Sequence, residues 1–354
     1  MQIMHKNDNH TKKLTSVQIA KLAGVSRSTV SRVINGYDNV PKATYDRVME
    51  VIRENNYHPH LSGQLLVGKK TGTLGFFWIK GKGKRIALDE LSSSYLVHVI
   101  ESAAQMGYLV LTCILENLSD PKNIDWVNKI FMQGRIDAGI FIGVDNDEPL
   151  LEALIGGGNV VGIFDHFHPD RTEPNRISVN FEEDTGGKII DYLHSLGHKK
   201  ISLVLGDMDR YSSIKRKESF LAAIERHGME IRPEWMCVGG IDELRGYDAA
   251  KEMLRKTAGN LPTAICANND AVAFGVYKAL AEANIVVPQQ ISVTGIDGHI
   301  RKLTPPLTTY AFDYHQLFSS LVTRTIAAVE QQADNPTTEF IKGQLLKRES
   351  CIQI

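Results

Sequence analysis

Short apolar runs alternate with amphipathic stretches along most of the chain from residue 71 onward. The runs have the length of buried strands, and the stretches between them repeat their apolar residues with a helical period. A strand followed by a helix and then by another strand predicts a parallel sheet with helices on both faces. The series restarts after Glu183, so we expect two doubly wound parallel-sheet subdomains. The expected strands are residues 72–79, 108–114, 138–142, 160–164, 201–205, 263–267 and 291–296, and the expected helices are residues 94–106, 124–133, 150–156, 217–227, 271–283 and one that ends at Leu196.

Polar residues at the ends of these expected strands are candidates for a ligand site. Ligands of doubly wound sheets bind beyond the carboxyl ends of the strands, so we expect a cleft between the two subdomains.

The segment before residue 59 carries a different pattern, that of short helices with strong end signals. Thr15 and Gln18 form a capping-box pair at the start of the first helix. Gly24 ends that helix, because glycine adopts left-handed backbone conformations at little cost. Ser26 can cap a second helix, which ends at Asn35 and Gly36. The residues expected to face the interior are Leu14, Ile19, Ala20, Leu22, Ala23, Val30, Val33 and Ile34, with Tyr45, Val48, Met49 and Ile52 from a third helix at 41–55.

Two short helices joined by a glycine turn predict a helix-turn-helix unit. Val30 packs back onto the first helix in such a unit, which leaves a polar face on the second helix. Side chains of this kind can contact base edges and phosphates in a major groove. The alternative is the solvated face of an ordinary small helical domain. The residues on this face are Arg27, Ser28, Thr29, Ser31 and Arg32.

The charge of the chain is divided unevenly between its two parts. Residues 1–70 contain eleven Lys and Arg against five Asp and Glu, a formal charge of +6, while the whole chain sums to −1. The remaining residues therefore carry −7. A basic head on an acidic body indicates that the head binds a polyanion.

The segment IAKLAGVSRSTVSRVING, which begins at Ile19, resembles the head of the lactose-repressor (LacI/GalR) family of bacterial transcription regulators. The resemblance implies that Arg27 and Ser28 open a recognition helix and read bases. It also implies a hinge helix after Tyr57-His58-Pro59, with Leu66 inserted into the minor groove at the operator centre. The DNA-binding residues implied in this way are Thr15, Ser16, Val17, Ser26, Arg27, Ser28, Thr29, Ser31, Arg32, Asn35, Asn39 and Leu66.

Motifs further along the chain are similar to the effector-binding core of the same family, which is like the periplasmic sugar-binding proteins. These motifs are HSLGHKKISLVLGD, KRKESFLAAI, PTAICANNDAVAFGV, ISVTGIDG and PPLTTYAFD. The resemblance implies that Arg216 grips hydroxyl or carboxylate groups of a small molecule and that Tyr314 can cover it with an aromatic ring. The effector-binding residues implied are Ser94, Tyr95, Asp165, Asn180, Arg216, Asn269, Asp297 and Tyr314. Carboxylates, amides and a guanidinium suit a ligand rich in hydroxyl groups. A cap or turn role is the alternative for each Asp or Asn, and a surface ion pair is the alternative for Arg216.

These patterns divide the chain into four expected parts. Residues 1–12 form a disordered N-terminus, 13–58 the helix-turn-helix domain, 59–70 the hinge helix and linker, and 71–354 the effector-binding and dimerisation core. Within the core, we expect an N-subdomain of about 71–180 and 309–335 and a C-subdomain of about 181–308 and 336–354.

Enzyme chemistry finds little support in the sequence. G-x-S-x-G, P-loop and H-E-x-x-H motifs are absent, so we expect no catalytic residues and no cofactor. His166 and His168 could bind a metal ion, but further ligands are missing, and we expect no metal site. Asp270 is expected to cap the helix that follows it. The four widely spaced cysteines are expected to be reduced thiols.

Two binding classes remain as alternatives to a regulator. A solute-binding receptor fits the body but not the basic head, and an architectural DNA-binding protein fits the hinge leucine but not the large core. No apolar run approaches the ~20 residues of a membrane span, and the N-terminus lacks a secretory pattern. We therefore expect a cytoplasmic protein.

The sequence thus predicts an effector-controlled transcription regulator, a repressor of carbohydrate-utilisation genes. Its expected partners are double-stranded, near-palindromic operator DNA, a sugar or sugar derivative, and a second copy of itself. The residues after Leu346 show no heptad pattern, so we expect a homodimer rather than a larger assembly. A purine or another metabolite acting as corepressor is the alternative effector.

Overall fold

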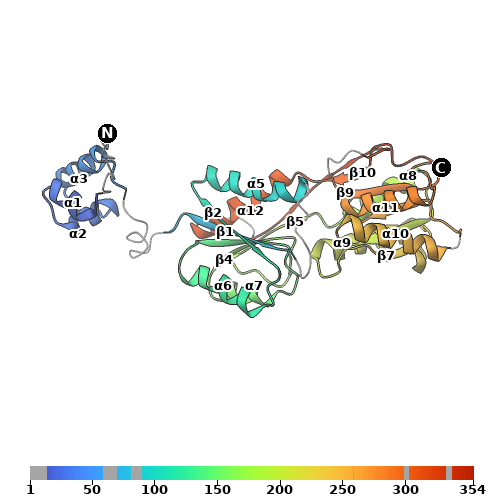
Figure 1. The fold of residues 1–354 in the computed structure, drawn as a ribbon, viewed down its shortest axis with the longest axis horizontal. Coiled ribbons are helices and arrows are strands. Elements are labelled where there is room, and N and C mark those ends of the chain that lie inside the picture. Colours follow the sequence, from blue (N-terminus) through green and yellow to red (C-terminus); the bar gives the residue numbers. More distant parts are fainter. Residues whose placement is uncertain (1–13, 59–69, 81–89, 258, 299–302, 332–336) are drawn as a thin grey trace, which may run out of the picture. The chain divides into compact units, whose positions relative to one another are not determined.

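The computed structural model describes residues 14–58, 70–80, 90–257, 259–298, 303–331 and 337–354. The chain divides into two compact units, Met1–Thr71 and Gly72–Ile354 (Figure 1). The hinge helix expected at 59–70 falls almost entirely outside the described residues, and so does Leu66. The helices in the described part of the chain lack either the length or the apolar character that a membrane crossing needs.

The first unit contains three helices, α1 (Ser16–Leu22), α2 (Arg27–Ile34) and α3 (Lys42–Glu54). The capping box is confirmed, because Thr15 N donates to Gln18 Oε1 at 2.8 Å and Gln18 N donates to Thr15 Oγ1 at 3.4 Å. The turn between α1 and α2 is also confirmed, with Gly24 at a φ of +64°. Its interior is formed by Ile19, Ala20, Ala23, Val30, Val33, Val48 and Tyr57.

Two residues expected in this interior lie at the surface instead. Leu22 is 57% exposed and Tyr45 is 39% exposed. The interior side of α1 is the one that carries Ala20 and Ala23, whose small side chains let α2 pack closely. Leu22 lies on a different side of α1. On α3, Val48 is fully buried, whereas Tyr45, which was also expected to be buried, is exposed.

The N-subdomain of the second unit is built on a six-stranded parallel sheet of order β11-β5-β4-β3-β1-β2. Helices α5 and α12 cover one face and α6 and α7 the other (Figure 1). Burial on both faces explains the nearly continuous apolar runs of its central strands. The elements are β1 (Thr73–Ile79), α5 (Glu90–Gln105), β2 (Leu109–Leu115), α6 (Pro121–Met132), β3 (Ala138–Ile142), α7 (Pro149–Gly156), β4 (Val160–Phe164), β5 (Arg176–Phe181), α12 (Tyr314–Val329) and β11 (Thr338–Ile341).

The C-subdomain has a second six-stranded sheet, of order β12-β10-β9-β8-β6-β7, in which only β12 is antiparallel to its neighbour. Helices α10 and α11 pack together over a core separate from the one that receives α8 and α9. The elements are α8 (Thr185–Ser195), β6 (Ile201–Leu205), α9 (Tyr211–Arg226), a 3-10 turn (Pro233–Trp235), β7 (Met236–Val238), α10 (Glu243–Thr257), β8 (Ala264–Ala267), α11 (Asp270–Glu282), β9 (Ser292–Asp297), β10 (Thr308–Ala311) and β12 (Gln344–Leu346).

The chain crosses between the two sheets three times, and two crossings differ from the expected boundaries. β10 pairs with β9 from Thr308 to Ala311, so the second crossing follows residue 311 instead of residue 308. β11 pairs with β5, so the third crossing follows Ile341 instead of residue 335. Strand pairing decides both boundaries, and the partners lie far away along the sequence.

The three crossings are held together by one hydrogen-bonded group. Glu182 follows β5 and accepts from Gly343 N at 2.7 Å, while Lys188 pairs with the same carboxylate. The hydroxyl of Tyr310 lies 2.5 Å from Glu182 Oε1 and 2.9 Å from Gly343 O. The segments that join the two subdomains are therefore fixed to one another.

Candidate nucleic-acid interface and ligand site

The start of α2 carries a linked set of hydroxyl groups. Ser26 caps the helix by accepting from Thr29 N at 3.1 Å. Its oxygen also lies 2.7 Å from Ser28 Oγ and 2.9 Å from Thr29 Oγ1. Ser28 is exposed and Thr29 is half-buried. The first turn of α2 therefore presents a fixed hydroxyl surface to solvent.

Two arginines lie on the same helix. Arg27 and Arg32 are exposed, and neither makes an ion pair with any residue that the structure describes. Ser31 is exposed between them, and its hydroxyl accepts from Asn35 Nδ2 at 3.3 Å. Unpaired guanidinium groups beside hydroxyls are suited to both phosphates and base edges.

The remaining expected DNA-binding residues flank α2. Thr15 and Val17 are exposed at the start of α1, with Ser16 half-buried between them, and Asn39 is exposed after α2. Asn35 is half-buried at the C-terminal end of α2. The expected DNA-binding residues that the structure describes thus lie on α2, at the start of α1 and in the turn after α2.

Arg216 on α9 is buried at the carboxyl ends of the C-subdomain strands. Its Nη1 donates to Asn268 O at 2.7 Å, and its Nη2 lies 3.4 Å from Asp297 Oδ1. The guanidinium carbon lies 5.0 Å from the centroid of the Phe181 ring. The surface ion pair considered for Arg216 is therefore wrong, because the side chain is 5% exposed and points into the protein.

Asp165 connects the two subdomains. It follows β4 at a φ of +61°, and its carboxylate accepts from Ser212 N at 2.7 Å and from Ser212 Oγ at 2.8 Å. Burial raises the pKa of Asp165, while the Ser212 hydrogen bonds, Arg216 and Arg210 act in the opposite direction. Asp165 therefore binds the N-terminal turn of a helix that belongs to the other subdomain.

Arg210 makes a second connection at the same place. Its Nη1 donates to Val144 O at 2.7 Å, and its Nε lies 3.8 Å from Asp145 Oδ1. Backbone contact accompanies it, since Asn146 N donates to Asp209 O at 3.1 Å. The loops after β3 and β4 thus meet the start of α9.

An aromatic wall adjoins Arg216 and Asp297. Tyr314, at the start of α12, stacks on Tyr95 with ring centroids 5.2 Å apart. Burial raises the pKa of Tyr314 well above its usual value, and the nearby Asp297 carboxylate acts in the same direction. Ser94 lies beside Tyr95 on α5, where its hydroxyl donates to Leu91 O at 2.6 Å. The other rings of this wall are Trp78, Phe164 and Phe318.

Two of the expected effector residues have structural roles. Asn269 caps α11 by accepting from Val272 N at 2.8 Å and donates to Ile241 O at 3.0 Å. Asn180 is fully buried, and its amide bonds both the N–H and the carbonyl of His166.

The cap expected from Asp270 is also wrong. Asp270 is the first residue of α11, and its Oδ1 accepts from Thr309 Oγ1 at 2.7 Å. Asn269 supplies the cap in its place, because β8 ends one residue earlier than a cap at Asp270 would need.

Asn268 was absent from the expected effector residues. It is 2% exposed and follows β8 directly. Its Oδ1 has no hydrogen-bond partner in the described part of the chain, and neither has Arg216 Nε. The sequence signal was the pair of adjacent asparagines, of which only one can cap the helix.

The histidine pair considered for metal binding has other surroundings. The rings of His166 and His168 lie 5.0 Å apart, and His168 Nε2 is 2.6 Å from Asn146 O. Among the described residues, no group of three or more His, Cys, Asp or Glu side chains has an arrangement that could hold a metal ion.

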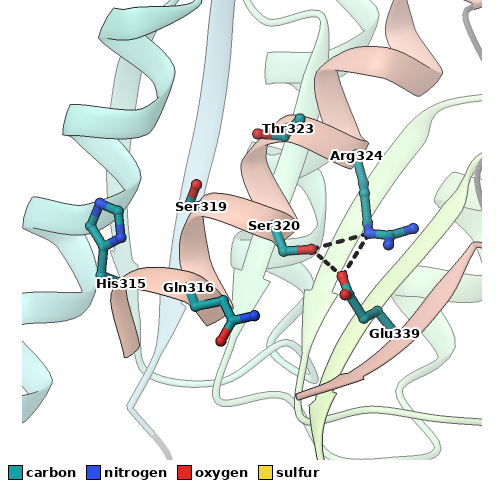
Figure 2. Close-up of a pocket in the computed structure, with 7 residues that line it drawn as sticks. All are labelled: His315, Gln316, Ser319, Ser320, Thr323, Arg324 and Glu339. Carbon is teal, nitrogen blue, oxygen red and sulfur yellow. Dashed lines mark hydrogen bonds and ion pairs between the residues drawn. The ribbon is translucent and has the colours of Figure 1, made fainter. Parts of the chain in front are cut away.

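A separate pocket in the N-subdomain is lined by residues of α12 and β11 (Figure 2). Its charged groups are already paired, with Arg324 Nε 2.8 Å from Glu339 Oε2 and 3.1 Å from Ser320 Oγ. None of the expected effector residues is among its lining residues, which are His315, Gln316, Ser319, Ser320, Thr323, Arg324 and Glu339.

Comparison with known families and proteins agrees with this division. Residues 17–60 match the family described as bacterial regulatory proteins, lacI family, and residues 190–351 match a periplasmic binding protein-like domain. The ribose operon repressor of Escherichia coli (strain K12) is 29% identical over 334 residues, covering 94% of this chain and 96% of that protein. The transcriptional repressor PurR of Pasteurella multocida (strain Pm70) is 26% identical over 343 residues, covering 95% and 98%.

Solved structures give the same result for the whole chain. The lac repressor dimer bound to operator and the anti-inducer ONPF is 26% identical with a TM-score of 0.76, covering 96% of this chain and 100% of that one. The complex of the regulator CelR with cellobiose has the same fold, at 21% identity and a TM-score of 0.71, covering 95% and 99%. The chain therefore combines the helix-turn-helix head of the lacI family of bacterial regulatory proteins with a periplasmic binding protein-like core of two parallel-sheet subdomains.

Proposed function

We propose that this protein is a sequence-specific transcription regulator, a repressor of carbohydrate-utilisation genes whose operator affinity is controlled by a sugar-like effector. One observation carries the proposal: a capped helix with unpaired Arg27 and Arg32 belongs to the same chain as a core that buries Arg216 at the strand ends. The first feature fits DNA and the second fits a small polar ligand. Catalytic activity forms no part of the proposal.

In this proposal the α2 face binds the major groove. Arg27 and Ser28, at the N-terminal end of α2, read base edges, because recognition helices contact bases with their first residues. Ser26, Thr29, Ser31, Arg32 and Asn35 contact phosphates. Further DNA contacts are proposed for Thr15, Ser16, Val17 and Asn39. Leu66 is proposed to enter the minor groove and bend the operator.

The effector is proposed to bind where both subdomains meet. Arg216, Asp297 and Asp165 supply polar groups, and Tyr314 with Tyr95 and Ser94 supplies the opposite wall. A polyol fits this combination, because its hydroxyls pair with the polar groups and its C–H face packs on aromatic rings. The stacked Tyr95 and Tyr314 rings favour a planar purine as the second candidate.

Effector binding is proposed to act through the connections between α9 and the N-subdomain. Asp165 with Ser212, and Arg210 with Val144, join loops of the N-subdomain to the start of α9. A ligand that binds more tightly to one of two arrangements of these loops increases the population of that arrangement. The factor by which the effector changes the affinity for DNA then equals the factor by which DNA changes the affinity for the effector.

A homodimer is proposed to present two heads to the two halves of a near-palindromic operator. Its interface is proposed along the sheet edges β2 and β7, which carry exposed apolar residues. Leu109 on β2 is 73% exposed and Val238 on β7 is 64% exposed. Exposed apolar edge strands are characteristic of surfaces that pair with another chain. The protein is proposed to act in the cytoplasm.

A ligand screen on the purified full-length protein tests the effector class. The probes are D-ribose, D-glucose, D-galactose, cellobiose, glucose 6-phosphate and hypoxanthine, each followed by thermal shift. A ligand at ~100 times its Kd stabilises the folded protein by ~2.7 kcal/mol, which gives a measurable rise in Tm. Stabilisation by one of the sugars supports the proposal, and stabilisation by hypoxanthine alone supports the second candidate.

A further inference from the structure

The side chain of Asn268 is a buried polar group at the junction of the subdomains, and its hydrogen bonding is incomplete. It is 2% exposed, and its Oδ1 has no hydrogen-bond partner within the described residues. Its Nδ2 is 3.5 Å from Ser213 Oγ, at the long limit for a hydrogen bond. An amide oxygen that is buried without a hydrogen-bond partner costs free energy unless another group donates a hydrogen bond to it.

The adjacent Asn269 differs in this respect. Its Oδ1 accepts from Val272 N, and its Nδ2 donates to Ile241 O, so both ends of its amide are engaged. Of the two neighbouring asparagines, one is used by the fold and the other is left for a ligand.

The Asn268 side chain has room beside Ser213 because residue 206 is a glycine. A Cβ on residue 206 would lie 2.3 Å from Asn268 Nδ2 and 2.3 Å from Ser213 Oγ, so glycine is needed there. The backbone carbonyl of Asn268 accepts from Arg216 Nη1. Asn268, Ser213 and Arg216 thus form one unit, and Arg216 Nε is a second buried group without a partner in the part of the chain described.

We propose that Asn268 is a specificity-determining residue that reads one hydroxyl group of the effector. This inference rests on the polyol-controlled function proposed above. The free Oδ1 accepts a hydrogen bond, so it selects a ligand atom that donates. Within a polyol that atom is a hydroxyl. An ether oxygen or a C–H at the same place would leave Oδ1 buried and unpaired, which costs a ligand about 10- to 100-fold in affinity.

The test uses calorimetric titration of the full-length protein with the sugar that stabilises it and with each monodeoxy derivative of that sugar. We expect wild type to bind one derivative about 10- to 100-fold more weakly than the parent sugar. In Asn268→Ala, the same derivative should bind about as well as the parent, because the group that discriminated between them is gone. Asn268→Asp, which retains an acceptor, should restore the discrimination.

Two further variants separate this effect from damage to the fold. Asn175→Ala removes an amide that donates to Ile155 O and Asn159 O in the N-subdomain, so it should lower Tm without changing the deoxy-sugar pattern. Asn269→Ser keeps a capping hydroxyl and compares the neighbouring asparagine directly with Asn268.

The outcomes distinguish the two proposals. Equal deoxy-sugar discrimination in wild type and Asn268→Ala would overturn the role of Asn268 and leave the polyol effector standing. Loss of discrimination in Asn269→Ser but not in Asn268→Ala would overturn it in favour of its neighbour. Failure of every polyol to stabilise wild type would overturn the proposed effector class, and the inference about Asn268 with it.

Discussion

Arg27 and Arg32 lie on one short helix, yet we assign them different tasks. Arg27 is at the N-terminal end of α2, where a recognition helix enters the groove, whereas Arg32 is in the last turn of the helix. A base contact carries sequence information, and a phosphate contact does not.

Arg27→Ala should lower affinity for the operator by about 1–3 kcal/mol and relax the preference at one base pair. Arg32→Ala should weaken binding to all DNA sequences similarly. It should also reduce the slope of log K against log salt concentration by about one. Fluorescence anisotropy on single-base operator variants at several salt concentrations measures both. Uniform weakening by Arg27→Ala across sequences would show that it does not read a base.

We assign Arg216 both a ligand-binding role and a structural one. Arg216→Ala should abolish the response of operator binding to the effector while sparing operator binding itself. It should also lower the free energy of unfolding by about 3–5 kcal/mol, since it removes a buried guanidinium and leaves the half-buried Asp297 carboxylate with its charge less compensated. Urea unfolding and anisotropy with and without effector measure the two effects. Survival of the effector response would place the ligand elsewhere.

His166 makes the stability of the core depend on pH. Burial lowers its pKa to about 4, helped by His168 and Arg176, whereas an exposed histidine has a pKa near ~6.5. The unfolded chain therefore binds a proton in this interval that the folded chain does not. The free energy of unfolding should fall by on the order of 3 kcal/mol as the pH decreases from about 6.5 to about 4.

His166→Gln should reduce this slope, measured by urea unfolding at several pH values. Burial also lowers the pKa values of His98 and His198, so part of the slope should remain. An unchanged slope in the variant would show that His166 does not titrate in this way.

At the scale of helices and strands, the sequence predicted the bounds that depend only on residues within the element itself. The strands expected at 138–142, 160–164 and 201–205 have those bounds, because central parallel strands are apolar throughout. Helix α9 was expected at 217 and begins at Tyr211. Its polar first turn resembles a loop, and Asp165 from the other subdomain supplies its N-terminal hydrogen bonds. No pattern within residues 211–216 contains that contact.

The candidate site was predictable to the same extent. Arg216, Asp297 and Tyr314 lie together, as the resemblance implied. The cap at Asn269 was not predictable, since the end of β8 decides which asparagine caps α11 and which remains buried. The bonds of Asn180 to His166 were not predictable either, because they depend on the pairing of β4 with β5.

The cap of α2 gives a prediction for an element. Ser26→Ala should destabilise α2 by about 1 kcal/mol, because Thr29 N loses its acceptor. Amide hydrogen exchange in α2 of the full-length protein should speed up by about fivefold, and Ser26→Asp, which restores an acceptor, should reverse this. Unchanged exchange in Ser26→Ala would show that the cap adds no stability.

For the whole molecule, the proposed dimer depends on the two apolar sheet edges. Leu109→Lys on β2 or Val238→Lys on β7 should convert the dimer to monomers in light scattering, because either charge would be buried at the interface. Met132→Lys is the matched control, since Met132 is 86% exposed at the end of helix α6 and belongs to neither edge strand. A dimer that persists in both edge variants would place the interface elsewhere.

The central claim is that a small molecule controls sequence-specific DNA binding by this chain. The most direct measurement is the affinity of the full-length protein for a DNA site selected from random sequences, with and without the stabilising sugar, at fixed salt. We expect the selected site to be near-palindromic, with half-sites about one or more helical turns apart, and to bind at least ~10³-fold more tightly than scrambled DNA. The sugar should change that affinity by about 5- to 150-fold, and Arg216→Ala should remove the change. Equal affinity for selected and scrambled DNA, with no effect of any sugar, would contradict the claim.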